Sequence, residues 1–146
     1  MGRLNFRGKK VYLDTVVIIY WIEENPIYTT LVKELWDSIN QQIIEVYTSE
    51  LSLMETLVVP LKFNNIALIN AYNNVVCDSA VYPIPIILSI LKFAAQLRAK
   101  FKVQTPDAIH LATAIASGCD IFLTNDFALQ KIPDLNIEVL VLKDFL

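Results

Sequence analysis

Short apolar runs alternate along this chain with longer segments in which apolar residues recur every three or four positions. The short runs are rich in β-branched and aromatic residues, which favours strands. They predict strands at 11–13, 43–48, 79–82, 120–123 and 137–142. The longer segments show helical periodicity and predict helices at 16–22, 29–41, 50–58, 64–76, 86–101 and 105–117, with a short helical turn at 127–130. Regular alternation of strands and helices predicts an α/β fold, with a central, mainly parallel sheet of four to five strands and helices on both faces.

The helix expected over 105–117 has the clearest start in the sequence. Thr105 can cap its N-terminus, and Pro106 suits the first helical position because no backbone hydrogen bond is lost there. Asp107 lies in the first turn, where a carboxylate interacts favourably with the unpaired N–H groups by about 0.3–1 kcal/mol. Taken alone, Asp107 needs no further explanation.

Two other acidic residues follow predicted strands directly. Asp14 comes after the first strand and Asp126 after the fourth, and ligands of parallel sheets bind at the carboxyl ends of the strands. Asp107 can reach the same edge of the sheet from its helix N-terminus. Glu55 borders the apolar face of the helix at 50–58. Two simpler interpretations stay open: Asp126 could only cap the turn at 127–130, and Glu55 could be solvated.

Composition indicates a compact protein with spare apolar surface. We expect a single domain over residues 1–146, because there is no repeat, linker or low-complexity tract. Apolar residues make up 55% of the chain and charged residues 18%. This apolar share exceeds that of an ordinary soluble domain, so we expect self-association, most simply as a homodimer, or a protein partner.

Several classes of protein and site are disfavoured. The longest uncharged apolar stretch, 81–91, is short and interrupted by prolines, so no membrane span is expected. The N-terminus lacks the pattern of a secretory signal, which favours a cytoplasmic location. Two isolated cysteines and one histidine indicate neither a disulfide framework nor a zinc site. The three glycines form no phosphate-binding loop.

A small basic cluster precedes the helix at 105–117. It consists of Arg98, Lys100 and Lys102. Such a run is usually a solvated helix end, but its position beside Asp107 makes it a candidate phosphate contact. The net charge of −3 argues against indiscriminate binding of polyanions.

Four converging carboxylates would require a cation. Two carboxylates about 4 Å apart repel by about 4 kcal/mol at an effective dielectric of 20. All-oxygen ligation selects Mg²⁺ or Mn²⁺ over zinc, and these ions activate water and polarise phosphodiesters. An aspartyl-nucleophile phosphatase is disfavoured, because Thr15-Val16 follows Asp14 without the second aspartate of such sites.

Four segments resemble the acidic motifs of PIN-domain ribonucleases. They are 11–15 (VYLDT), 48–56 (TSELSLMET), 105–114 (TPDAIHLATA) and 122–126 (FLTND), in the order of the family. The sequence is most similar to the small VapC-type toxin nucleases, which pair with an antitoxin. The resemblance runs from about Val11 to Leu142. It implies a PIN-like fold and a metal-dependent endoribonuclease, usually dimeric, whose toxin members cleave structured RNA.

The resemblance also implies roles for individual residues. Asp14, Asp107 and Asp126 would ligate Mg²⁺ or Mn²⁺ directly or through water, and Glu55 would hold a metal-bound water. Support residues would be Thr15, Thr124 and Asn125, and the candidate RNA contacts are Arg98, Lys100 and Lys102.

Two other functions stay open on the sequence: a PIN-like RNA-binding or adaptor protein that does not cleave, and a structure-specific DNA nuclease of related fold. Retention of all four acids argues against the first, since clustered negative charge does not help to bind RNA. For His110, we favour a packed structural role over a general base. For Trp21 and Trp36, we favour core packing over base stacking.

Overall fold

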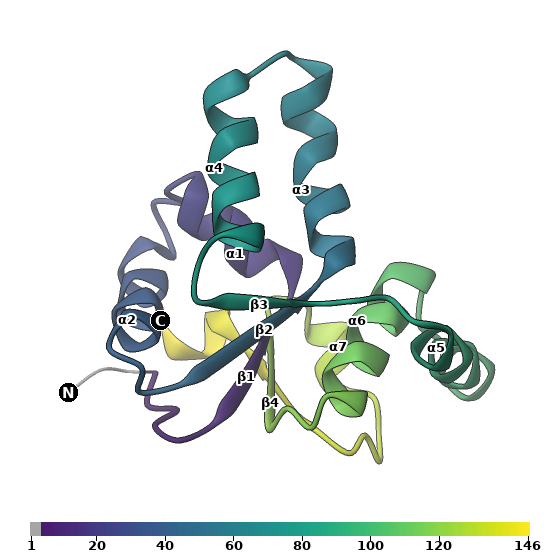
Figure 1. Cartoon of the computed structure of the whole chain (residues 1–146). Helices are drawn as coiled ribbons and strands as arrows, with labels where there is room; N and C mark the ends of the chain where they lie inside the picture. Colours follow the sequence, from purple (N-terminus) through teal and green to yellow (C-terminus); the bar gives the residue numbers. More distant parts are fainter. Residues whose placement is uncertain (1–3) are drawn as a thin grey trace.

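The fold is organised around one parallel sheet, described here by a computed structural model over residues 4–146. Its strands are β1 (Lys10–Leu13), β2 (Glu45–Ser49), β3 (Val81–Ile84), β4 (Ile121–Thr124) and β5 (Glu138–Val141). They lie in the order β3-β2-β1-β4-β5, and every neighbouring pair is parallel. The predicted α/β architecture is confirmed, and β1 occupies the centre of the sheet (Figure 1).

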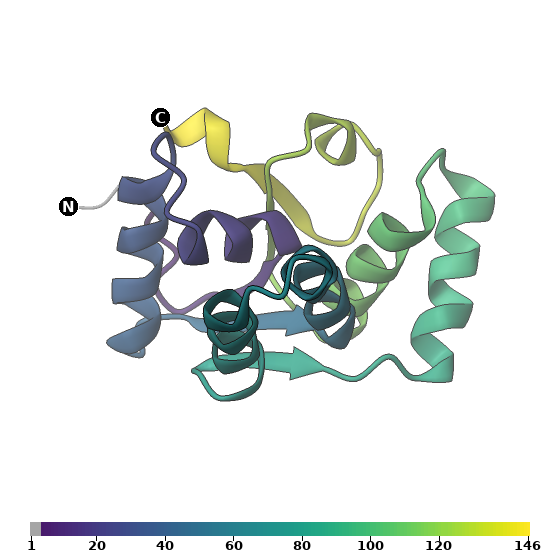
Figure 2. The ribbon, with the colours of Figure 1, turned by 90° about the horizontal axis from the view of Figure 1, so that it is seen from above.

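Helices cover both faces of this sheet. They are α1 (Thr15–Ile22), α2 (Thr29–Asn40), α3 (Glu50–Lys62), α4 (Ile66–Cys77), α5 (Leu88–Lys100), α6 (Thr105–Ala116) and α7 (Phe127–Gln130), followed by a 3₁₀ turn at Leu142–Phe145. Figure 2 shows α1 and α2 on one side of the sheet and α5 and α6 toward the other end of the molecule.

Alternation along β1 divides the core in two. Val11 and Leu13 pack in one cluster with residues of α1, α2 and α4, whereas Tyr12 packs in a second cluster with residues of α5 and α6. Adjacent side chains of a strand point to opposite faces, so each strand contributes to both clusters. The carboxyl end of β1 therefore lies between two packed layers, which hold the residues that follow it in place.

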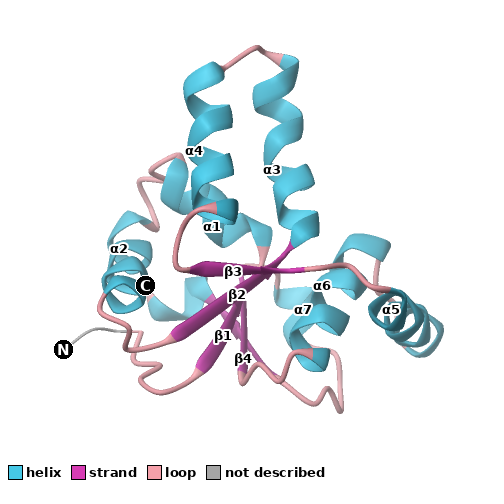
Figure 3. Cartoon of the chain, viewed as in Figure 1, coloured by secondary structure: helices cyan, strands magenta, loops and turns pink. Residues whose placement is uncertain are grey.

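Helices α3 and α4 form a hairpin that stands away from the sheet (Figures 1 and 3). Helix α3 starts directly after β2, where the Ser49 side chain caps it by accepting from the Leu51 N–H at 3.0 Å. The helix is longer than predicted: it passes through Pro60 and ends at Lys62. Pro60 lies in the last turn and is buried, so only one backbone hydrogen bond near the helix end is lost.

Two local predictions on α5 and α6 are wrong. Thr105 is the first residue of α6 and does not cap it; its hydroxyl instead accepts a hydrogen bond from Arg98 Nη1 at 2.8 Å. On α5, the helical periodicity predicts that Leu91, Ala94, Ala95 and Leu97 face inward. Ala94 and Leu97 are buried as predicted, but Leu91 and Ala95 are exposed and Ile90 is buried instead. Among residues 4–146, no helix is both long enough and apolar enough to cross a membrane.

Candidate active site

Asp14 joins the ends of the two central strands. It follows β1 and caps α1, with Oδ1 accepting from the Thr15 N–H at 2.9 Å. Its Oδ2 accepts from the hydroxyl of Thr124, at the end of β4, at 2.7 Å. Both oxygens are therefore oriented by neighbouring groups, and each keeps a lone pair for a further ligand.

Asp126 lies beyond the end of β4, next to Thr124. Its Oδ1 accepts from the Ala128 N–H at 2.9 Å and caps α7, while its own N–H donates to Thr124 Oγ1 at 3.2 Å. The capping interpretation made from sequence is thus seen in the structure. Capping uses one carboxylate oxygen and leaves the other available, so it does not conflict with a role as a metal ligand.

Asp107 in the first turn of α6 is electrostatically coupled to both of these acids. Burial raises the pKa of its carboxyl to about 6, and the negative charges of Asp14 and then Asp126 add to the increase. This coupling shows that the three carboxylates, which are far apart in sequence, share one region at the carboxyl edge of the sheet.

Glu55 reaches the same region from α3 and is held by hydrogen bonds. Its Oε1 accepts from Thr15 Oγ1 at 2.7 Å and contacts His110 Nε2 at 2.6 Å. Burial by itself would raise the pKa of Glu55, but the hydrogen bonds from His110 and Thr15 outweigh it, and the pKa lies below its usual value. Glu55 is therefore an ionised carboxylate at neutral pH.

His110 completes this arrangement, and its contact with Glu55 was not predicted. The ring is 1% exposed, and its Nδ1 lies 2.6 Å from the hydroxyl of Tyr12. Burial, followed by the charge of Asp14, raises the pKa of Tyr12 well above its usual value. The Tyr12 hydroxyl therefore stays protonated and donates a hydrogen bond to Nδ1. In a neutral imidazole the proton must then be on Nε2, which donates to Glu55.

The donor set fits a hard divalent cation. Asp14, Asp107 and Asp126 supply only carboxylate oxygens, and a cation between them would relieve the repulsion that contributes to the raised pKa of Asp107. Within residues 4–146, no three His, Cys, Asp or Glu side chains converge closely enough to form a complete metal site. The carboxylates would therefore have to move closer together around an ion.

An open hollow of about 490 Å³ lies beside these acids. Asp14 and Asp126 line it, together with Val16, Tyr20, Thr124, Asn125 and Phe127. Asn125 is held by two hydrogen bonds: Nδ2 donates to the Tyr20 hydroxyl at 3.1 Å, and Oδ1 accepts from the Lys143 N–H at 3.1 Å. The hollow is large enough for a small organic ligand.

The three candidate RNA contacts are not among the residues that line this hollow. Arg98 is engaged within the fold, where Nε donates to the Val103 carbonyl at 3.1 Å and Nη1 to Thr105. Lys100 Nζ lies 5.3 Å from the centre of the Phe101 ring, and Lys102 is exposed. An RNA contact by these residues stays a prediction.

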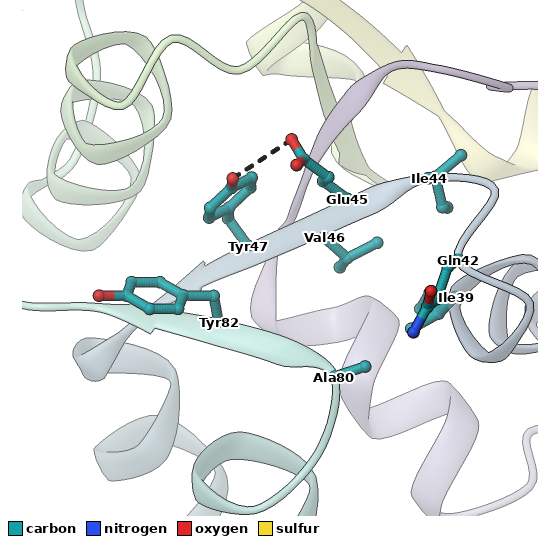
Figure 4. Close-up of a pocket in the computed structure, with 8 residues that line it drawn as sticks. All are labelled: Ile39, Gln42, Ile44, Glu45, Val46, Tyr47, Ala80 and Tyr82. Atoms are coloured by element: carbon teal, nitrogen blue, oxygen red, sulfur yellow. Dashed lines mark hydrogen bonds between the residues drawn. The ribbon is translucent and has the colours of Figure 1, made fainter.

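A second hollow, of about 390 Å³, contains none of the candidate site residues. It is lined by the end of α2 and by β2 and its neighbours, and Figure 4 shows Tyr47, Tyr82 and Glu45 in its wall. The Tyr47 hydroxyl donates to Glu45 Oε2 at 3.5 Å, and the two tyrosine rings meet edge to face. Glu45 is the single acid among its lining residues, so this hollow lacks the pair of carboxylates that lines the first.

The sequence matches the model of one protein family over most of its length. Residues 11–135 match the PIN domain, so the chain belongs to the PIN-domain family. This confirms the family that the four motifs indicated. Among curated protein sequences, none matches the chain closely.

Solved structures of toxin–antitoxin proteins have a similar fold. VapBC2 of Rickettsia felis, bound to a DNA fragment from its promoter, is 18% identical with a TM-score of 0.67, covering 89% of this chain and 98% of that one. VapC20 of Mycobacterium tuberculosis, a toxin that cleaves the sarcin–ricin loop, is 16% identical with a TM-score of 0.66, covering 84% and 95%. A toxin–antitoxin complex from Klebsiella pneumoniae is 19% identical with a TM-score of 0.63, covering 90% and 97%. At these identities the likeness concerns the fold.

Proposed function

We propose that this protein is a metal-dependent endoribonuclease that hydrolyses phosphodiester bonds in structured RNA, and that it is the toxin of a toxin–antitoxin pair. The observation that carries the proposal is that Asp14 and Asp126 line one hollow at the carboxyl edge of the sheet, with Asp107 electrostatically coupled to both. Membership of the PIN-domain family supports it. A structural neighbour described as cleaving the sarcin–ricin loop favours RNA as the substrate.

Asp14, Asp107 and Asp126 would hold Mg²⁺ or Mn²⁺. Such an ion, when bound, lowers the pKa of a coordinated water and polarises the phosphodiester. Thr124 orients Asp14 by donating to Oδ2, and Asn125 holds the segment after β4 against Tyr20 and Lys143. These contacts orient Asp14 and the segment that carries Asp126 before substrate arrives.

Glu55 would orient the attacking water and accept its proton. Thr15 and His110 both contact Oε1 and, within residues 4–146, no hydrogen bond is made to Oε2, which can accept one from water. The lowered pKa of Glu55 keeps the group ionised and able to accept. No protein nucleophile is required, because water is the attacking group.

Cleavage of RNA by the purified, antitoxin-free protein tests the proposal. We expect structured RNA to be cut with Mg²⁺ or Mn²⁺ and to stay intact with EDTA. Asp14→Asn and Asp107→Asn should abolish cutting, whereas Asp78→Asn, an exposed acid after α4, should not. Absence of cleavage under every metal, or full activity of both site variants, would refute the assignment. Cleavage of DNA alone would favour the related DNA nuclease.

We also propose that the protein binds a small antitoxin and forms a homodimer in the cytoplasm. Toxin–antitoxin complexes among the structural neighbours favour the antitoxin. Large apolar side chains are exposed on the α3–α4 hairpin, at Met54, Val58, Val59, Leu61, Phe63 and Ile66, and on α5 and the residue before it, at Ile87, Leu88 and Leu91. Protein partners of either kind would cover such surfaces.

A further inference from the structure

The hollow beside the carboxylates has an exposed aromatic ring in its wall. Phe127 follows Asp126 at the start of α7, lines the hollow and is 40% exposed. Its neighbours in that wall include the acids Asp14 and Asp126 and the amide of Asn125. A flat ligand that covered the ring would remove apolar surface from water.

Lys143 brings a positive charge to the same ring. Its Nζ lies 5.9 Å from the centre of the Phe127 ring, within reach of a cation–π contact. The backbone of Lys143 is tied to Asn125, which also holds Tyr20, and the Tyr20 ring is stacked on Tyr28 at 4.6 Å. The Lys143 backbone is therefore fixed next to Asn125, and its side chain places the ammonium group near the Phe127 ring, which lines the hollow.

Charge and shape together select the ligand. A phosphate that approaches Asp14, Asp107 and Asp126 enters a negative field, and Lys143 offsets part of that field. An aromatic ring combined with a cation is the pairing by which proteins bind single-stranded nucleic acid, since the base stacks and the phosphate is neutralised. The volume of about 490 Å³ is in the range of small-ligand sites.

We infer that Phe127 and Lys143 form a subsite for the nucleotide next to the scissile phosphate. Its base stacks on the exposed part of the Phe127 ring, and Lys143 contacts its phosphate. The inference rests on the proposed function, which places the scissile phosphate at the carboxylates. The ligand is an unpaired ribonucleotide, because a base within an RNA helix is already stacked and paired.

Steady-state cleavage of an RNA that the wild type cuts tests the subsite. Phe127→Ala should raise KM roughly tenfold, as expected for one lost base stack, and raise KM more than it lowers kcat. Phe127→Tyr should restore KM, and the non-aromatic Phe127→Leu should not. Lys143→Ala should reduce the slope of log KM against log salt by about 0.7, the value for one phosphate on a single strand. Lys62→Ala, at the far end of α3, is the matched control and should change neither quantity.

The outcomes separate the subsite from the proposed function. A wild type that cleaves RNA while Phe127→Ala keeps its KM would overturn the subsite alone. A wild type that cleaves no RNA would refute the proposed function, and the subsite is then tested by fluorescence of Phe127→Trp in an Asp107→Asn background with Mg²⁺. An oligoribonucleotide should quench the new tryptophan and ribose 5-phosphate should not. The Asp107→Asn protein that keeps Phe127 measures the fluorescence of Trp21 and Trp36, which is subtracted. Absence of quenching by the oligoribonucleotide would overturn the inference.

Discussion

His110 connects the centre of the sheet with the carboxylates through the two nitrogens of its ring. One nitrogen contacts Tyr12 on β1, and the other contacts Glu55 on α3. A packed structural position was predicted for His110, and its burial is confirmed. Its contact with Glu55 could not be predicted, because the two residues are 55 positions apart and only the packing of α3 against the sheet brings them together.

Replacing His110 should therefore alter both stability and the pH dependence of cleavage. In His110→Phe the buried Tyr12 hydroxyl loses its acceptor, which should lower the free energy of unfolding by about 1–3 kcal/mol. Glu55 loses the hydrogen bond from His110, which lowers its pKa. The pKa of Glu55 should therefore rise, because burial is then opposed mainly by the hydrogen bond from Thr15. Since the proposed mechanism uses Glu55 as a carboxylate, the acid limb of the pH–rate profile should move to higher pH. His110→Gln, whose amide can still donate to Glu55, should restore part of the profile; an unchanged acid limb in His110→Phe would contradict the role assigned to the contact.

Asp107 should make the metal-free protein more stable at mildly acidic pH. Its pKa is about 6 in the folded state and 3.8 as the reference value for the unfolded chain. Above pH 6 the Asp107 carboxylate is charged in both states. In the folded state, burial of this charge and its repulsion by Asp14 and Asp126 lower stability. Between about pH 6 and 4 the folded state binds a proton that the unfolded state does not, so stability rises as the pH falls.

Thermal unfolding in EDTA measures this effect as a difference between wild type and Asp107→Asn. The variant should be the more stable protein at pH 7.5, and its advantage should shrink toward pH 5. Using the difference cancels the contribution of groups that do not interact with Asp107. An advantage that stays constant from pH 7.5 to 5 would show that Asp107 is not destabilised in the fold.

At the scale of elements, the strands and helices were largely predictable, and the errors have local causes. The strands are short apolar runs ending in polar residues, and the observed bounds differ from the predicted ones by at most two residues. Helix α3 continues through Pro60 because the proline falls in its last turn. Thr105 does not cap α6 because its hydroxyl accepts from Arg98, a contact between two helices that no local pattern reveals.

The positions of three of the acids at element ends could also be read from the sequence. Asp14 and Asp126 follow strands, and Asp107 lies in the first turn of a helix. What could not be read is the set of contacts that orients them, such as the Thr124 hydroxyl on Asp14, because these join residues about a hundred positions apart.

Arg98 should stabilise the connection between α5 and α6. Its guanidinium spans Val103 and Thr105, so Arg98→Ala should lower the free energy of unfolding by roughly 1 kcal/mol. Lys100→Ala on the same helix end is the control and should stay within about 0.5 kcal/mol of wild type. Chemical denaturation measures the stability of both variants. Equal midpoints for Arg98→Ala and wild type would contradict the stabilising role of Arg98.

Arg98→Lys separates this role from RNA binding. It keeps the charge but loses the planar group that makes both contacts, so it should be destabilised like Arg98→Ala. If Arg98 also contacts RNA, as predicted from sequence, cleavage by Arg98→Lys should keep the wild-type salt dependence, and Arg98→Ala should lose part of it.

For the molecule as a whole, association through the free edge of β3 is disfavoured. The Val81 N–H donates to the Ser79 hydroxyl at 3.1 Å, and Pro83 has no N–H. Neither residue offers a donor to an added strand, which protects the edge from pairing with another chain. The exposed apolar side chains of the α3–α4 hairpin and of α5 remain as surfaces for a partner.

Introducing charge on both helical surfaces should therefore yield a monomer. Light scattering of the antitoxin-free wild type should give the mass of two copies, and the double variant Phe63→Asp with Leu88→Asp should give the mass of one. Phe63 is 72% exposed and Leu88 is 74% exposed, so the new carboxylates stay in water and the fold should keep its thermal stability. A second copy that covered either residue would instead bury an unpaired charge, which opposes association strongly. The two single variants then assign self-association to the hairpin or to α5. A double variant that keeps the mass of two copies would exclude both surfaces as the dimer interface.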